Sequence, residues 1–149
     1  MGYPVTTEPT QAFVDAVQTR LAADSGLTAI IGTRLYAALP KSARVTLPYL
    51  VLGRRSVLRD AGPMATPAGL VSLTIEGWSS ARGPDEMARM LSRVSAVLER
   101  ETLSVDGHDM VDGSLTCEMS EVMDEPDQDM PDRVLFHGVQ RWSAEIHQT

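Results

Sequence analysis

One serine stands in a setting that could support nucleophilic catalysis. Ser79 lies between an apolar stretch and a helical pattern, within the segment GWSSA at residues 77–81. Serine hydrolases carry the nucleophile on a sharp strand-to-helix turn, with small residues two positions away on each side. The chemistry also needs a histidine as general base and an acid that orients it. The pattern around Ser79 therefore raises acyl transfer as one candidate activity.

The surroundings of Ser79 argue against that activity. The preceding segment places Ser72, Thr74 and Glu76 on one face, whereas a hydrolase nucleophile follows a strand buried on both faces. The available general bases lie in a predicted turn, in the middle of a strand and near the C-terminus; they are His108, His137 and His147. We therefore expect Ser79 and Ser80 to be turn and cap residues, and we expect no catalytic residue.

An acidic segment, DEPDQDMPD at residues 124–132, could supply oxygen ligands for calcium. The calcium loop of EF-hands needs a glycine at its sixth position and a glutamate at its twelfth. Counted from Asp127, these positions hold Asp132 and Gly138. We therefore predict neither a metal nor a cofactor, and interpret the segment as a solvated loop that contacts a partner. Its candidate contact residues are Asp124, Asp127 and Asp129.

Three arginines near the end of an apolar segment form a second candidate contact. Arg54, Arg55 and Arg59 could bind phosphate or the acidic loop of an adjacent copy, and a solvated sheet edge is the alternative. The segment DAGPMATPAG follows at residues 60–69, and loops of this length are often binding or assembly loops. Asp60 and Met64 are its candidate contacts.

Composition limits the remaining classes of function. A chain of 149 residues with 43% hydrophobic content matches one ordinary domain over residues 1–149, with residues 1–8 as a flexible N-terminus. Twenty acidic against 13 basic residues give a net charge of -7, which disfavours a general nucleic-acid clamp. The single cysteine, Cys117, excludes an intrachain disulfide and fits a reducing cytoplasm, where we expect it to be a small buried hydrophobe. No apolar run approaches the roughly 20 residues of a membrane span, so no membrane partner is predicted.

Two segments have the pattern of amphipathic helices. The first is predicted to begin near Thr7, with Pro9 in its first turn, and to end at Gly26, followed by a short turn. The second is predicted to have Gly83 as its cap and Pro84 as its first residue. Its apolar stripe consists of Met87, Met90, Leu91, Val94, Val97 and Leu98.

The remaining segments have the pattern of strands, at residues 33–40, 47–58, 70–78, 114–123 and 134–146. Val71, Leu73 and Ile75 alternate with polar residues, which indicates a sheet with one dry and one wet face. Asp106-Gly107 predicts a hairpin turn, and Leu115, Cys117 and Met119 are expected on one face of the next strand. The order predicts an α+β fold, with a mainly antiparallel β-sheet and two principal α-helices packed on one face.

The order of these elements resembles the tail-completion family of long-tailed bacteriophages. The resemblance rests on LAAD, LTAIIG, RLYAALP, LPYLVLG, EGWSS, VLE and DGH in this order, and extends from Pro9 to Ile146. The loops at residues 60–69 and 124–132 match no family pattern residue by residue. The resemblance implies a subunit of a hexameric ring, a tail terminator that caps the tail tube and joins the tail to the head connector.

The same resemblance implies the partners and the location. The partners would be further copies of the chain, the major tail tube protein and a head connector or stopper protein, with DNA only passing through the bore. The protein would be made in the host bacterial cytoplasm and end in the neck of the virion. We also expect the acidic loop or the polar strand face to contribute to the bore. The alternatives are another neck component, such as a head-completion or stopper protein, and a small hydrolase that uses Ser79.

Overall fold

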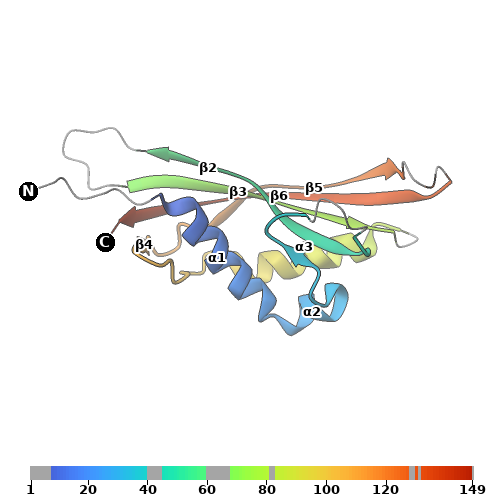
Figure 1. Ribbon diagram of the computed structural model, residues 1–149, viewed down its shortest axis with the longest axis horizontal. Coiled ribbons are helices and arrows are strands. Elements are labelled where there is room, and N and C mark those ends of the chain that lie inside the picture. Colours follow the sequence, from blue (N-terminus) through green and yellow to red (C-terminus); the bar gives the residue numbers. More distant parts are fainter. Residues whose placement is uncertain are drawn as a thin grey trace, which may run out of the picture.

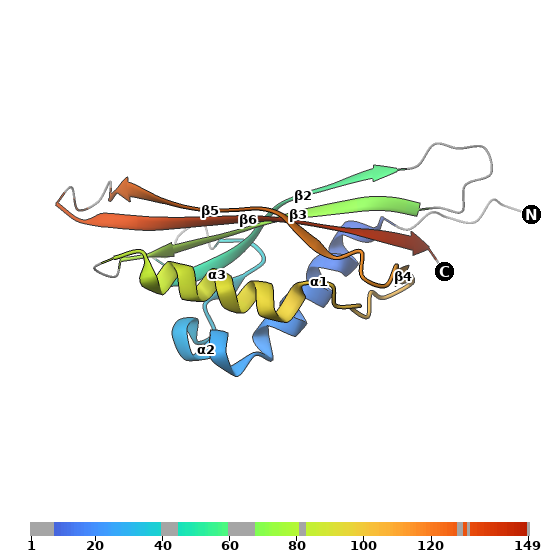
Figure 2. The ribbon, with the colours of Figure 1, turned by 180° about the vertical axis from the view of Figure 1, so that it is seen from behind.

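Helices and strands form two layers in the computed structural model, with the sheet above and the helices below in Figure 1. The structure describes residues 8–39, 45–59, 68–80, 83–127, 130 and 132–148. All three described helices lie on one face of the sheet, as the reverse view in Figure 2 also shows. The predicted α+β class, with helices on one face, is therefore confirmed.

The first helix, α1 (Pro9–Ala22), begins with Pro9 in its first turn, as predicted. Its cap is Glu8, whose carboxylate accepts a hydrogen bond from the Thr10 N–H at 2.9 Å. The predicted cap, Thr7, lies outside the described residues. Residues such as Phe13 and Val17 turn one stripe of α1 into the core.

The prediction that Gly26 ends the first helix is wrong. Gly26 lies inside a second helix, α2 (Ser25–Ile31), in the segment predicted to be a turn. The cause is Asp24, whose carboxylate accepts a hydrogen bond from the Leu27 N–H at 2.8 Å and caps the new helix. The left-handed residue that ends α2 is Gly32, with φ of 60°.

The third helix, α3 (Asp85–Leu98), carries the predicted apolar stripe over the sheet. Its buried residues are Met87, Met90, Leu91, Val94 and Leu98, and Val97 is partly buried. The helix begins one residue later than predicted, since Pro84 takes the cap position. Gly77 and Gly138 pair across the sheet beneath α3. A Cβ at Gly138 would lie 2.5 Å from the Met87 sulfur, so glycine permits the close approach of helix and sheet.

The sheet orders its strands as β1-β2-β3-β6-β4, and β5 also pairs with β6. The strands are β1 (Leu35–Tyr36), β2 (Tyr49–Arg59), β3 (Ala68–Ser79), β4 (His108–Met110), β5 (Thr116–Pro126) and β6 (Val134–Gln148). All pairs are antiparallel except β1 with β2, which is parallel. The mainly antiparallel sheet predicted from the order of elements is therefore present.

The dry and wet faces of the sheet lie as predicted. Val71, Leu73 and Ile75 are fully buried against the helices, whereas Ser72 and Thr74 between them are partly exposed. On β6, Trp142 is fully buried and continues the dry face. We call the face of the sheet away from the helices the open face. Among the described residues, no helix is long and apolar enough to cross a membrane.

The segment from Asp106 to Met119 departs from the predicted pattern. Residues 106 and 107 form the predicted turn, with Gly107 at φ of 74°, but it leads into β4, which pairs with β6 and not with the preceding segment. The alternation on β5 breaks after Cys117, where the pairing with β6 shifts register, so Met119 is 40% exposed. Cys117 is half-buried, not buried as predicted, and its burial raises the pKa of its thiol.

Candidate assembly surface

Aromatic side chains form one row across the open face. Tyr49 on β2 pairs with Trp78 on β3, which pairs with His137 on β6. The Trp78 and His137 rings stack with centroids 4.3 Å apart and planes at 11°, and the Tyr49 and Trp78 rings stack at 5.3 Å. Tyr36 meets Tyr49 edge to face at 6.2 Å. The row therefore links four strands, because stacked and edge-to-face aromatic pairs stabilise a fold beyond the area that they bury.

Carboxylates from two strands flank the imidazole of His137. Glu125 on β5 places its Oε1 3.0 Å from His137 Nδ1, and Glu76 on β3 places its Oε1 3.3 Å from Nε2. The Nε2 contact lies within ion-pair distance but lacks hydrogen-bond geometry, so we assign the directional bond to Glu125 alone. Burial raises the pKa of the nearby Tyr49 hydroxyl above its ordinary value, and the Glu76 charge adds to that effect. This part of the open face is thus polar, ordered and acidic.

The predicted arginine cluster is divided by the structure. Arg55 turns toward its own chain and donates from its guanidinium to three carbonyls, those of Ala37, Leu52 and Gly53. Its Nη1 also reaches Gln11 Oε1 at 3.4 Å. Arg54 lies at the register shift in β2 and is exposed. The side chain of Arg59 and the whole of Asp60 and Met64 lie outside the described residues. Arg54 is therefore the described arginine of the cluster that faces solvent.

The acidic segment is more ordered than the predicted solvated loop. Asp124, Glu125 and Pro126 belong to β5 and pair with β6. Asp127 is buried, and its carboxylate accepts a hydrogen bond from Arg133 Nε at 2.8 Å. Asp129 lies outside the described residues. Of the three predicted contact residues, Asp124 is the one that the structure places on the exposed surface.

Ser79 is not the predicted turn or cap residue, since it is the last residue of β3, and α3 has no side-chain cap. Ser79 is fully buried at the end of β3, and its hydroxyl donates to Glu86 Oε1 in the first turn of α3 at 2.6 Å. It faces the helices, whereas its neighbour Trp78 stacks on His137 at the open face. No group of three metal-ligating side chains occurs among the described residues.

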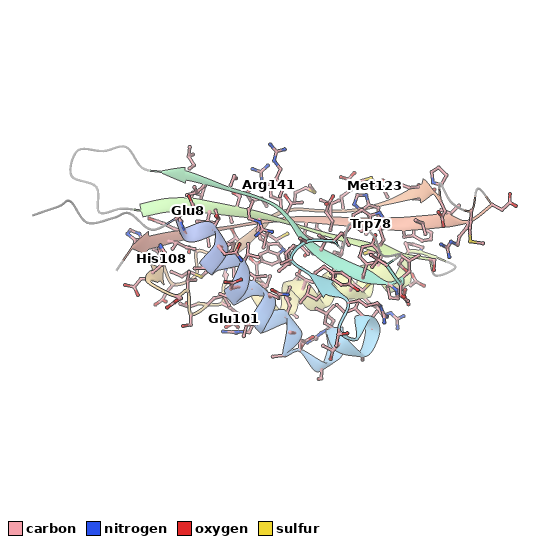
Figure 3. All side chains as sticks on the ribbon, in the orientation of Figure 1. Glu8, Trp78, Glu101, His108, Met123 and Arg141 are labelled. Atoms are coloured by element: carbon pink, nitrogen blue, oxygen red, sulfur yellow. The ribbon has the colours of Figure 1, made fainter. Side chains whose placement is uncertain are left out.

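The sequence analysis missed the row of Tyr49, Trp78 and His137. The types of these residues are visible in the sequence, but their contact depends on the register of β2, β3 and β6. The open face also carries a charged pair in the middle of the sheet, where Arg141 Nε lies 3.3 Å from Glu118 Oε2. Figure 3 shows Arg141 pointing away from the helices, and Trp78 and Met123 toward one end of the sheet. Sheet register is therefore what assembles this surface.

Comparison with protein families identifies the family of this chain. A family model described as tail completion protein gp17 matches residues 15–147, which include every helix and strand at least in part. The chain belongs to this family. The resemblance predicted from the order of elements is confirmed by that match, and a structural, tail-associated role follows from membership of the tail completion family.

The fold of this family member is also present in a solved structure. A chain from a structure titled "Virion of native gene transfer agent (GTA) particle" superposes with a TM-score of 0.71. The alignment covers 91% of this chain and 96% of that chain, at 22% sequence identity. A search of curated protein sequences finds no match. At that identity the likeness establishes the shared fold.

Proposed function

We propose that the protein is a tail terminator, which forms a hexameric ring on the end of the tail tube. The observation that carries the proposal is the match to the tail completion family over residues 15–147. In this role the ring stops polymerisation of the tube and joins the tail to the head connector. The protein acts through its surface and not as an enzyme, and the buried position of Ser79 supports that part of the proposal.

The proposed partners are further copies of the chain, the major tail tube protein and a connector or stopper protein. Residues 1–149 act as one domain, and the protein is made in the host bacterial cytoplasm before it enters the neck of the virion. The solved chain of similar fold comes from a particle titled as a virion, which supports this location. DNA passes through the bore without specific binding, and no cofactor, metal or membrane takes part.

Charge on the open face supports passage of DNA without binding. This face and its edge carry the acidic residues Glu76, Glu121 and Glu145, together with the basic residue Arg141. Like charges deny DNA a binding site, so an acidic bore lets the duplex slide. Charge reversal at Asp124 tests the contribution of the acidic segment, because Asp127 is already neutralised by Arg133. The same variant with unchanged DNA passage and unchanged ring assembly would remove the segment from the bore.

Deletion of the gene tests the proposal directly. Cells that lack the protein should make tails of uncontrolled length that fail to join heads, as electron microscopy would show. Tails of normal length beside unjoined heads would instead assign the protein to a head-completion or stopper role. In solution, light scattering should find a particle of six 16.2-kDa subunits, about 97 kDa.

A further inference from the structure

Two of the long strands, β5 and β2, each have an edge without a partner strand in the described part of the chain. On one side, β5 pairs only with β6, and the five residues 118–122 are all exposed, on both faces of the strand. On the other side, β1 pairs with β2 only at Leu50 and Val51, so among the described residues the second half of β2 has no partner strand on that side. Unpaired edges present backbone N–H and C=O groups that can bind a strand of another chain.

The two edges carry opposite charge. β5 contains Glu118, Glu121, Asp124 and Glu125 and no lysine or arginine, whereas β2 contains three arginines and no acid. Glu118 is paired with Arg141, and Glu125 with His137. Glu121 and Asp124 are exposed and make no ion pair with the described residues, and the same holds for Arg54 on β2. The unsatisfied charge on one edge is therefore acidic, and on the other basic.

Strand direction also suits a contact between the two edges. The strands β2, β3, β6 and β5 are four consecutive antiparallel neighbours, so β2 and β5 run in opposite directions. A copy rotated about an axis roughly along the strands keeps these directions. Its β2 then lies antiparallel to β5 of the first copy, which is the more stable pairing. A contact that joins different surfaces in this way closes into a ring when the rotation divides a full turn.

We propose that β5 of one copy pairs with the second half of β2 of the next copy, so that the sheets join edge to edge around the ring. Glu121 and Asp124 on β5 then lie along each junction, opposite the part of β2 that carries Arg54. Two-fold pairing of β5 with β5 would place carboxylates of the two copies against each other. Two-fold pairing of β2 with β2 would place Arg54 of one copy near Arg54 of the other. Like charges opposite one another destabilise a strand pair. The inference rests on the proposed ring, and names the surface that builds it.

Charge exchange tests the proposed junction. The variant E121K/D124K should raise the subunit concentration at half-assembly roughly tenfold or more, because each junction then opposes like charges. Adding R54E to that variant should restore much of the assembly. The control D15K changes an exposed acid on α1, on neither edge strand, and should assemble as the wild type does. Normal assembly of E121K/D124K at moderate salt would overturn the proposal.

Disulfide trapping tests the contact without relying on charge. In a Cys117→Ser background, Ser56→Cys on β2 is combined in turn with Cys at 119 or 121 on β5; all three positions are exposed, and the strand register places them on the open face. Positions 56 and 119 lie on strands separated by β3 and β6, so a disulfide between them must join two copies. Oxidation should yield a ladder of covalent multimers up to the ring. Dimers from Met119→Cys alone would show β5 pairing with β5, and would overturn the proposal.

The same variants separate this inference from the proposed function. Trapping is done both in solution and on purified tails, with Ser104→Cys and Met119→Cys as a control pair, since Ser104 is exposed in the loop between α3 and β4 and lies on neither edge strand. A wild-type ring on tails without any ladder from the edge pairs would overturn the edge contact and leave the terminator role intact. A wild-type protein that is absent from tails and monomeric in solution would overturn both.

Discussion

The two faces of the sheet use the same strands for different purposes. On the covered face, Trp142, Leu73 and Ile75 are fully buried beneath the helices. On the open face, the Tyr49, Trp78 and His137 row and the Arg141–Glu118 pair are ordered but partly exposed. Burial on the covered face supplies hydrophobic free energy of folding, whereas polar side chains on the open face remain partly exposed to solvent. Substitutions at adjacent residues of one strand should therefore have unequal effects on stability.

The largest contrast is expected at residues 141 and 142. Trp142→Ala should lower the free energy of unfolding by about 3 to 5 kcal/mol, because it leaves a large cavity in the core. Arg141→Ala, the adjacent open-face variant, should change it by less than about 1 kcal/mol, since its ion pair is half exposed. Urea denaturation of both variants measures the difference. Equal losses of stability in the two variants would contradict the conclusion that the covered face contributes more to folding than the open face.

The buried amide of Gln140 tests whether the covered face depends on polar as well as apolar contacts. Its Nε2 donates to the Leu91 carbonyl at 3.2 Å and to the Ser95 hydroxyl at 3.1 Å, and its Oε1 accepts from Trp142 Nε1. Gln140→Leu should cost about 1 to 3 kcal/mol, because the buried indole N–H loses its acceptor. Ser95→Ala, which removes one partner and spares the indole, should cost less in the same denaturation assay. A Gln140→Leu variant as stable as the wild type would show that packing alone suffices.

A third variant tests the close contact between α3 and the sheet. Gly138→Ala places a Cβ 2.5 Å from the Met87 sulfur and 2.9 Å from its Cγ. The expected loss is about 1 kcal/mol, at the low end for overpacking, because Met87 can change rotamer. The matched control is Gly83→Ala, where no atom lies within 4 Å of the added carbon. Thermal unfolding by circular dichroism measures both, and only Gly138→Ala should melt at a lower temperature.

The smallest effect is expected at the edge of the helical layer, where Arg93 on α3 meets Asp24 before α2. Arg93 Nη2 lies 2.7 Å from Asp24 Oδ1, and this hydrogen bond, with the Leu27 N–H, holds the pKa of Asp24 below its usual 3.8. A depressed pKa stabilises the folded state above pH 3.8, and that contribution is lost as the pH falls through the folded pKa.

Asn at position 24 isolates this charge effect from the helix cap. Asp24→Asn keeps a side-chain oxygen for the Leu27 N–H but removes the carboxylate charge. The difference in stability between wild type and Asp24→Asn should be constant near neutral pH and shrink below pH 3.8, as acid titration of urea midpoints would measure. A difference that persists unchanged at pH 2 would assign the effect to the cap.

Local patterns predicted much of the covered face. The alternation of Val71, Leu73 and Ile75 and the stripe of Met87 to Leu98 each match the observed burial, because one side of each element faces the core. The end of the first helix was wrong because the Asp24 cap starts a new helix and overrides the glycine that follows. Both the correct and the incorrect predictions concern signals that act within a few residues.

The open face and its edges were less accessible from the sequence. Asp124 and Glu125 read as a loop from their charge and the adjacent proline, but pairing with Phe136 and Leu135 on β6 makes them a strand. The stacking of Trp78 on His137 joins residues far apart in the chain, and depends on a register that no local pattern encodes. The sequence therefore identified candidate contact residues by their types, but the environment of each residue depends on how the strands pair.

The position of β6 in the chain has a consequence for biosynthesis. This last strand pairs with β3 on one side and with β5 and β4 on the other, so it links both parts of the sheet. On the ribosome, the helices and the β2–β3 pair can form early, but the two parts of the sheet can join only after residues 134–148 have emerged. Until then the edge of β3 lacks its partner and is open to other nascent chains. A chaperone that covers the edge of β3 until β6 has paired with it should therefore raise the yield of folded subunits.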